Sequence, residues 1–106
     1  MPEAQVFWAE PALEDLRSVV EYIRRYSPER AEGVGRAILS AAERLAAFPL
    51  SGRKVPEFPA LPLREVIVEQ HRLIYRVGEG DRVFILAIVH TRRHLPEAID
   101  LETRLP

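Results

Sequence analysis

Three side chains in the second half of the chain could together cleave a phosphodiester bond. Glu57 could accept a proton, Arg64 could bind the phosphate, and His90 could protonate the leaving oxygen. Such a set cleaves RNA through its 2′-hydroxyl group and needs no metal ion. Each residue also has a structural interpretation, because a single histidine at a strand end more often stabilises the fold. The three residues therefore define a hypothesis of catalysis.

Arginines on one predicted strand suggest a binding surface. Arg72 and Arg76 point to one face of that strand, and Arg64 and His90 join them from the flanking strands if the register allows. This cationic patch would lie on the sheet face away from the helices and bind phosphate or carboxylate. The alternative is ion pairing with acids of this chain or of a partner, and the acids within reach are Glu65 and Glu69.

Metal and cofactor sites are not expected. The sequence has no cysteine, which excludes disulfides, thiolate nucleophiles and cysteine metal sites. His90 and His94 are four residues apart, a spacing that aligns two ligands on a helix but not across a strand end and a loop. No glycine-rich phosphate loop is present. Catalysis would therefore depend on His, Arg, Glu or Tyr.

Composition predicts one domain over residues 1–106. The chain is 47% hydrophobic and 29% charged, which is ordinary for a folded protein with a single modest core. No apolar run approaches the roughly 18 residues of a membrane span, so we expect a cytoplasmic protein without membrane contact. The net charge of −1 hides a basic second half, but the excess is far below that of a typical DNA-binding domain.

Two helices are predicted after a short strand at Gln5–Trp8. Pro11 opens the first helix, and Ser27 and Pro28 end it and begin the second. We expect Trp8, Tyr22 and Tyr26 to pack in the core. The second helix carries an apolar seam at steps of three and four residues, typical of an antiparallel helix hairpin. The seam consists of Ala31, Val34, Ile38, Ala41, Leu45 and Phe48.

Three further strands are predicted to form an antiparallel meander over Leu63–Gln70, Arg72–Val77 and Val83–Thr91. The last strand is apolar on both faces, so it needs a central position with the N-terminal strand beside it. Before the meander, Pro49–Pro62 is predicted to be a loop held by fixed φ angles and not by hydrogen bonds. A short helical turn is expected within Pro96–Leu105. The predicted fold is α+β, with the helix hairpin packed on one face of the sheet.

Several ordered motifs resemble the RelE/ParE superfamily of toxins from bacterial type II toxin-antitoxin systems. They extend from about Val6 to His94 and include Pro49–Glu57, Leu63–Glu65, His71–Val77 and Ile85–Arg93. The resemblance implies a small α+β toxin that a cognate antitoxin neutralises by laying a flexible segment across its surface. The superfamily divides into ribosome-dependent messenger RNA endonucleases, such as RelE and YoeB, and inhibitors of DNA gyrase, such as ParE.

The resemblance leaves the target open. In the nuclease branch Glu57 would be the general base, Arg64 the phosphate-binding residue and His90 the acid. However, the motif match places Val66 at the arginine position, and no tyrosine follows Tyr75, although nuclease members usually have an aromatic residue at the chain end. We favour the ParE-like branch, in which these residues are structural or contact the antitoxin. A third alternative is a non-toxic protein that only binds an antitoxin-like partner.

The expected partners are an antitoxin and either DNA gyrase or the ribosome with messenger RNA. The strand that begins at Leu63 is expected to have a free edge, to which a partner could add a strand or a helix. The residues expected to contact the antitoxin or the target are Arg53, Lys54, Arg64, Arg72, Arg76, Arg92 and Arg93.

Overall fold

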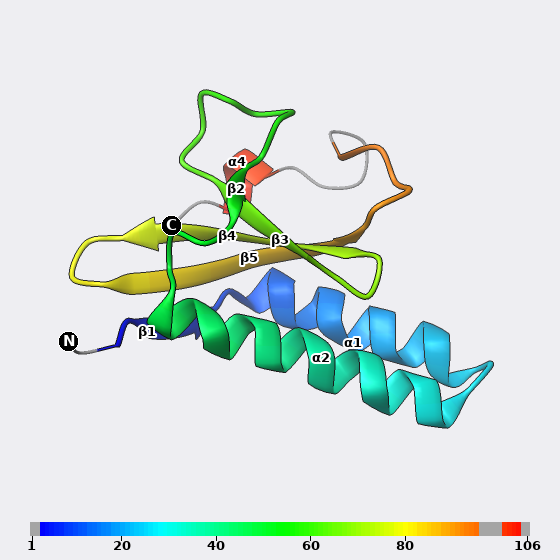
Figure 1. Cartoon of the computed structure of the whole chain (residues 1–106). Helices are drawn as coiled ribbons and strands as arrows, with labels where there is room; N and C mark the ends of the chain where they lie inside the picture. Colours follow the sequence, from blue (N-terminus) through cyan, green and yellow to red (C-terminus); the bar gives the residue numbers. More distant parts are fainter. Residues whose placement is uncertain (1–2, 96–100, 105–106) are drawn as a thin grey trace.

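The computed structural model of the chain describes residues 3–95 and 101–104. A five-stranded sheet with the strand order β1-β5-β4-β3-β2 has two long helices packed on one face (Figure 1). This arrangement confirms the predicted α+β class, the helix hairpin and the antiparallel meander. The elements are β1 (Gln5–Trp8), α1 (Glu10–Arg24), α2 (Pro28–Ala47), β2 (Arg53–Lys54), β3 (Arg64–Val68), β4 (His71–Gly78), β5 (Arg82–His90) and α4 (Leu101–Arg104).

The helix hairpin forms where the sequence predicts it. The Ser27 side chain accepts a hydrogen bond from the Arg30 backbone N–H at 3.2 Å and so caps α2, with Pro28 in its first turn. The seam of α2 is buried from Ala31 to Leu45. Phe48 is the exception, because it follows the last turn of α2 and its exposed fraction is 65%.

The prediction of core positions for Tyr22 and Tyr26 is wrong. Their exposed fractions are 61% and 76%. The two rings contact each other edge to face, with centroids 5.5 Å apart. Trp8 is different, because it is partly buried against the core between the helices and the sheet. The helical apolar period thus points to the core at Leu16, Val19 and Ile23, and the tyrosines lie on another side of α1.

The N-terminal strand pairs with the last strand, as predicted. β1 runs parallel to β5, from Gln5 beside Arg82 to Trp8 beside Ile85. Beyond Ile85, the described side chains of Asp15 and Arg104 contact the peptide groups of the β5 edge. Asp15 accepts a hydrogen bond from the Ile88 backbone N–H at 3.0 Å. The peptide groups of this edge are therefore partly satisfied from α1.

Both faces of the sheet are covered, which corrects the expectation of an exposed arginine-bearing face. The loop that follows β2, together with α4, lies on the face away from the helices (Figure 1). A second apolar cluster, with residues from this loop and from α4, lies on the same face. The cluster joins strand residues to loop and C-terminal residues. It consists of Val55, Leu63, Ile74, Leu86, Ala87, Val89, Leu95 and Leu101.

A β-bulge in β5 lets this strand supply both clusters. Ile74 of β4 lies opposite Ala87, whereas the next residue, Tyr75, lies opposite Ile85, so Leu86 is the extra residue. Leu86 and Ala87 consequently both belong to the second cluster. The alternation of faces is shifted by one residue for the rest of β5.

The prediction that the loop before the meander is not held by hydrogen bonds is wrong. Backbone hydrogen bonds join Val55 to Leu63, Phe58 to Val55, and Leu61 to Phe58. β2 pairs with the start of β3, at Glu65 and Arg64. The free edge expected from Leu63 is therefore covered at its beginning, and the strand edge without a partner strand in the described residues is Val66–Val68.

Two turns connect the strands of the meander. The turn at Gly78–Asp81 is formed as predicted, with positive φ at Gly80 and Asp81. The turn between β3 and β4 has positive φ at Glu69 (48°) and Gln70 (65°), although neither residue is glycine. Left-handed backbone costs energy for residues with a Cβ atom, so this turn is strained.

The C-terminal helical turn is present as α4, whereas residues 96–100 and 105–106 lie outside the described residues. In the part of the chain that is described, no helix is long and apolar enough to cross a membrane.

Candidate functional site

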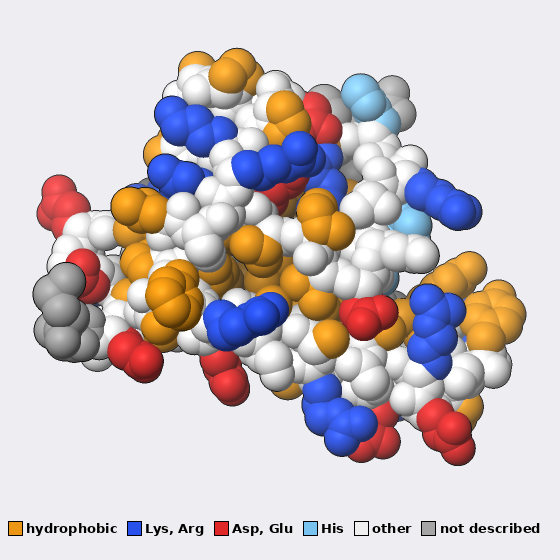
Figure 2. Space-filling model, viewed as in Figure 1, with side chains coloured by type: hydrophobic (Ala, Val, Ile, Leu, Met, Phe, Trp, Pro, Cys, Tyr) orange, Lys and Arg blue, Asp and Glu red, His pale blue; other side chains and the backbone are white. Residues whose placement is uncertain are grey.

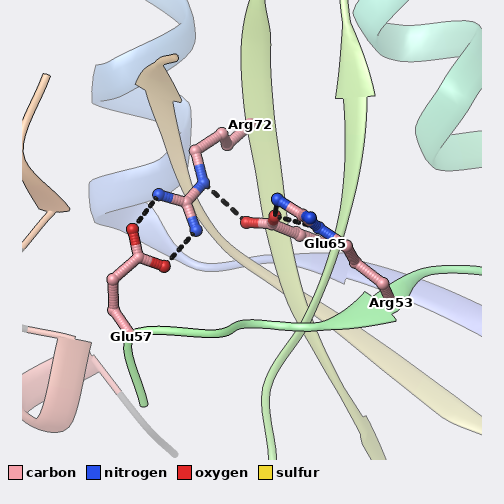
Figure 3. A network of polar contacts seen from close by, with 4 residues as sticks. All are labelled: Arg53, Glu57, Glu65 and Arg72. Atoms are coloured by element: carbon pink, nitrogen blue, oxygen red, sulfur yellow. Dashed lines mark hydrogen bonds and ion pairs between the residues drawn. The ribbon is translucent and has the colours of Figure 1, made fainter. Parts of the chain in front are cut away.

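Four charged side chains form a network on the sheet face away from the helices (Figure 3). Arg72 of β4 binds both carboxylate oxygens of Glu57, each at 2.7 Å, and its Nε donates to Glu65 at 2.6 Å. Glu65 also accepts a hydrogen bond from Arg53 at 2.7 Å. Each charge in this network therefore has at least one opposite charge in direct contact.

Burial separates this network from an exposed cationic patch. The Arg72 side chain is 7% exposed and that of Glu65 is fully buried. The hydrogen bonds from Arg72 lower the pKa of Glu57 to about 2, and the same pairing raises the pKa of Arg72. The predicted patch is therefore incorrect at Arg72, because ion pairing with Glu65, the alternative left open from the sequence, is what the structure contains.

The structure does not bring Glu57, Arg64 and His90 together. Arg64 lies beside Tyr75 on β4, whereas His90 lies beside His71, four residues along the same strand. Four residues of β-strand correspond to about 13 Å. Arg64 donates hydrogen bonds to the backbone of the loop after α2, at Gly52 (2.8 Å), and so contributes to the loop structure.

The bulge places His90 on the opposite face of the sheet from Glu57. Residues directly opposite each other on neighbouring strands share a face. His90 is opposite His71, and both line a cavity beside α1, whereas Arg72 of the charge network is opposite Val89 of the second cluster. The hypothetical base and acid are thus separated by the sheet itself.

The remaining predicted cations have varied environments. Arg53 and Lys54 of β2 are exposed, and Arg53 pairs with Glu65. The Arg76 guanidinium lies over the Phe84 ring, 5.0 Å from its centroid, and its buried Nε has no hydrogen-bond partner within the described residues. Arg92 and Arg93 follow the end of β5 and are exposed. Figure 2 shows several Lys and Arg side chains close together in the upper left part of the face that it displays, and others apart from them.

Two features that sequence reasoning missed lie on the helix side. His71 and His90 contact each other edge to face, with centroids 5.2 Å apart, in a cavity of about 660 Å³. The Tyr75 hydroxyl donates to the Pro49 carbonyl at 2.8 Å and accepts from the Gly52 N–H at 2.9 Å. Burial raises the pKa of Tyr75, which keeps this hydroxyl protonated. The hairpin turn at Gly78–Asp81 sets the register of β4 and β5, but this register pairs His71 with His90 only when the extra residue of the bulge is included.

Residues 3–95 and 101–104 contain no group of three or more His, Asp or Glu side chains that could hold a metal ion. The charge network has carboxylates, but each of them is occupied by arginine.

A groove runs between α2 and the edge of β3. Residues of α2, among them Leu45, line it together with Phe48 and Val66–Val68. Figure 2 shows hydrophobic side chains gathered between α2 and the strands above it. An apolar groove beside an open strand edge is a typical place for a protein partner.

Known proteins are similar to this chain over most of its length. Residues 6–95 match the family described as "ParE toxin of type II toxin-antitoxin system, parDE". A curated relative, Toxin RelE2 of Caulobacter vibrioides, is 36% identical over 91 residues, which cover 85% of this chain and 98% of that protein.

Solved structures share the fold. The chromosomal ParDE toxin-antitoxin system of P. aeruginosa has a chain that superposes with a TM-score of 0.67 at 24% identity, covering 85% of this chain and 98% of that one. The RelBE2 toxin-antitoxin complex of Mycobacterium tuberculosis gives 0.63 at 24% identity, with coverages of 85% and 99%. The match over residues 6–95 and the curated relative together show that the chain belongs to the ParE toxin family, within the RelE/ParE superfamily of type II toxin-antitoxin systems.

Proposed function

We propose that this protein is a toxin that inhibits DNA gyrase by binding and not by catalysis. The observation that carries the proposal is the bidentate pair between Glu57 and Arg72. A general base works best with a pKa near the working pH, and the pKa of Glu57 is about 2. A carboxylate held in this way is a poor acceptor for the proton of a ribose hydroxyl.

The placement of the other two residues supports the same proposal. A nuclease needs its base, phosphate-binding residue and acid around one reacting phosphate. Here the acid candidate His90 lies on the helix side of the sheet, and Arg64 binds the loop after α2. The family match to ParE toxins agrees with a binding function. Growth arrest through gyrase is thus the expected consequence of expressing the protein alone.

The proposed regulator is an antitoxin protein. The two similar solved structures are described as a chromosomal ParDE toxin-antitoxin system and as the RelBE2 toxin-antitoxin complex. On this chain the edge of Val66–Val68 and the groove beside α2 offer backbone hydrogen bonds next to apolar surface. We expect the antitoxin to use this edge, with Arg53, Lys54, Arg92 and Arg93 available for its carboxylates.

The test is a supercoiling assay with purified protein, DNA gyrase, ATP and relaxed plasmid. Lost supercoiling together with trapped cleaved DNA is the expected result. The double variant Arg64→Ala, His90→Ala should inhibit gyrase about as well as the parent protein, provided that circular dichroism shows it to be folded. Unaffected gyrase would contradict the proposal.

A parallel assay separates the alternatives. Purified ribosomes with a bound messenger RNA should remain intact if the protein is a gyrase inhibitor. Cleavage of that RNA, lost in the same double variant, would assign the protein to the ribosome-dependent nucleases. A protein inactive in both assays that still forms a complex with an antitoxin would be the non-toxic partner.

A further inference from the structure

The cavity on the helix side of the sheet has the size and the groups of a small-molecule site. Its volume is about 660 Å³, within the usual range of roughly 300–1,000 Å³ for ligand pockets. It lies between α1, the first turn of α2 and the ends of β4 and β5. The lining residues that bear on its chemistry are Tyr22, Arg30, Glu69, His71, His90 and Arg93.

Backbone contacts fix the hydrogen-bonding direction of both imidazoles. The Nδ1 atom of His71 lies 2.8 Å from the Glu69 carbonyl oxygen, so Nδ1 carries a proton and donates it. The Nδ1 atom of His90 accepts the Arg92 backbone N–H at 3.1 Å, so its proton is on Nε2. In the neutral rings, His71 therefore retains an acceptor at Nε2 and His90 a donor at Nε2.

His71 is 8% exposed, and its Nε2 atom has no hydrogen-bond partner within the described residues. Burial, the largest cause, lowers the pKa of His71, and the charges of His90 and Arg30 lower it further. A buried neutral imidazole with an unused acceptor in a cavity is suited to a hydroxyl donor from a ligand.

The two guanidinium groups at the cavity have no ion-pair partner among the residues that the structure describes. Arg30 comes from the first turn of α2, and Arg93 follows β5. The cavity also has two acids. Asp15 is already bound by Arg104 at 2.7 Å and by the Ile88 N–H, whereas Glu69 is exposed on the turn. The unpaired charge around the histidines is thus mainly positive, which favours an anion.

An aromatic ring and a strained turn complete the cavity. Tyr22 lines it with an exposed fraction of 61%, so its ring keeps free surface for a flat ligand group beside its edge-to-face contact with Tyr26. The positive φ angles of Glu69 and Gln70 occur at the same rim, and they aim the Glu69 carbonyl at His71. Backbone strain of this kind is concentrated at functional sites.

We propose that this cavity binds a nucleotide phosphate monoester, with Arg30, Arg93 and the His90 Nε2–H on the phosphate, His71 Nε2 on a ribose hydroxyl, and Tyr22 stacked on the base. A dianion with three free oxygens uses more of these donors than a carboxylate does. The ligand could be a free nucleotide or the phosphorylated 5′ end of a strand. This site goes beyond gyrase inhibition and does not depend on it.

The first experiment is isothermal titration calorimetry of the full chain with adenosine 5′-monophosphate. We expect saturable binding, with inorganic phosphate binding at least about fivefold more weakly because it lacks the base and the ribose. Titrations with a 5′-phosphorylated RNA tetranucleotide and with the same strand without the phosphate show whether the ligand is a free nucleotide or the 5′ end of a strand. Tight binding of only the phosphorylated strand assigns a strand end, and equal binding of the monophosphate assigns a free nucleotide.

Variants at exposed positions test the assigned contacts. Arg30→Ala and Arg93→Ala should each weaken adenosine monophosphate binding roughly tenfold, because each removes a charge-assisted hydrogen bond. Tyr22→Ala should weaken the nucleotide but leave inorganic phosphate unchanged. Arg82→Ala is the matched control, since Arg82 is exposed at the opposite end of β5.

The proposal is overturned by any of three results. The first is no heat of binding at millimolar monophosphate with a folded protein. The second is binding that Arg30→Ala and Arg93→Ala leave unchanged. The third is binding of a glutamate-rich peptide in place of the nucleotide, which would assign the cavity to a protein partner. The same protein batch is assayed on gyrase, so failure of this site and failure of gyrase inhibition are distinguished.

Discussion

The arginines on the two faces of the sheet differ in burial and in ion pairing. On the face away from the helices, Arg72 contacts two carboxylates and is almost fully buried. On the helix side, Arg30 and Arg93 have no ion-pair partner within the described residues and line the same cavity as two imidazoles. The first group holds a loop against the strands, whereas the second leaves its donors free. Charge alone therefore does not identify a binding surface in this protein, because pairing decides what remains for a ligand.

The comparison also separates two uses of hydrogen bonding. Tyr75 and Arg72 both connect β4 to the segment between α2 and β3, one on each face of the sheet. The His71 side chain, also on β4, instead donates a hydrogen bond to the Glu69 carbonyl of the neighbouring turn. β4 therefore both anchors the segment between α2 and β3 and lines one side of the helix-side cavity.

Removing the buried carboxylate of the network should have the largest effect. Glu65→Ala would leave Arg72 in a buried site with one partner fewer, and breaking such a pair costs about 3–5 kcal/mol of unfolding free energy. Urea unfolding followed by circular dichroism measures it. Glu43→Ala, an exposed acid on α2, is the control and should be nearly neutral. If Glu65→Ala lowered the unfolding free energy by less than about 1 kcal/mol, the buried network would not be a structural feature that distinguishes this face from the helix side.

The tyrosine on the other face should have the next largest effect. Tyr75→Phe keeps the ring but leaves the Gly52 N–H and the Pro49 carbonyl without their partner, at a cost of about 1–3 kcal/mol. Thermal unfolding would measure the change. Tyr26→Phe is the matched control, because the exposed Tyr26 side chain lies at the end of the hairpin. Equal stability of the two variants would show that the hydrogen bonds of the Tyr75 hydroxyl do not stabilise the loop after α2.

Acid should weaken the network through Glu57. Its pKa falls from 4.5 to about 2 on pairing with Arg72, so the unfolded chain takes up a proton at higher pH than the folded one. The stabilisation is complete above about pH 4.5 and is lost as the pH falls towards 2. Unfolding free energies from pH 6 to 2 should therefore decline less in Glu57→Gln than in the parent. The same slope in both proteins would contradict the pairing.

The helix-side cation should have the smallest effect on stability. Arg93→Ala removes an exposed side chain with no ion pair in the described part of the chain, so the unfolding free energy should change by no more than about 0.5 kcal/mol. Differential scanning calorimetry at neutral pH is sufficient. A larger loss would place Arg93 among the structural residues, like Arg72.

The fold could be predicted because the spacing of apolar residues and the turn residues clearly indicate the helices and strands. The α2 seam from Ala31 to Leu45 and the turn at Gly78–Asp81 each indicate one local structure. The pairing of β1 with β5 also followed, because a strand that is apolar on both faces needs neighbours. These features depend on residues close together in the sequence or on burial, which amino-acid type reports directly.

The candidate site was much less predictable. A single extra residue, Leu86, reverses the faces of the end of β5, and no residue type marks this bulge in an apolar run. His90 therefore lies on the side that simple alternation does not give. The partners of Arg72 were also ambiguous, because Glu57 is fifteen residues away and only the folded loop brings it close. Tyr22 was misplaced because aromatic residues are usually buried, and here one remains exposed.

The parallel pairing of β1 with β5 has a consequence for synthesis of the chain. β1 is made before the other described strands, but its only partner strand in the described structure is β5, the last of these strands to be made (Figure 1). The helix hairpin can form early from local contacts, whereas the sheet closes only after about residue 90 has emerged. A ribosome that stalls before this point holds a hairpin with an apolar face and an unpaired first strand. The five-stranded sheet of this toxin domain can therefore close only after β5 has been synthesised.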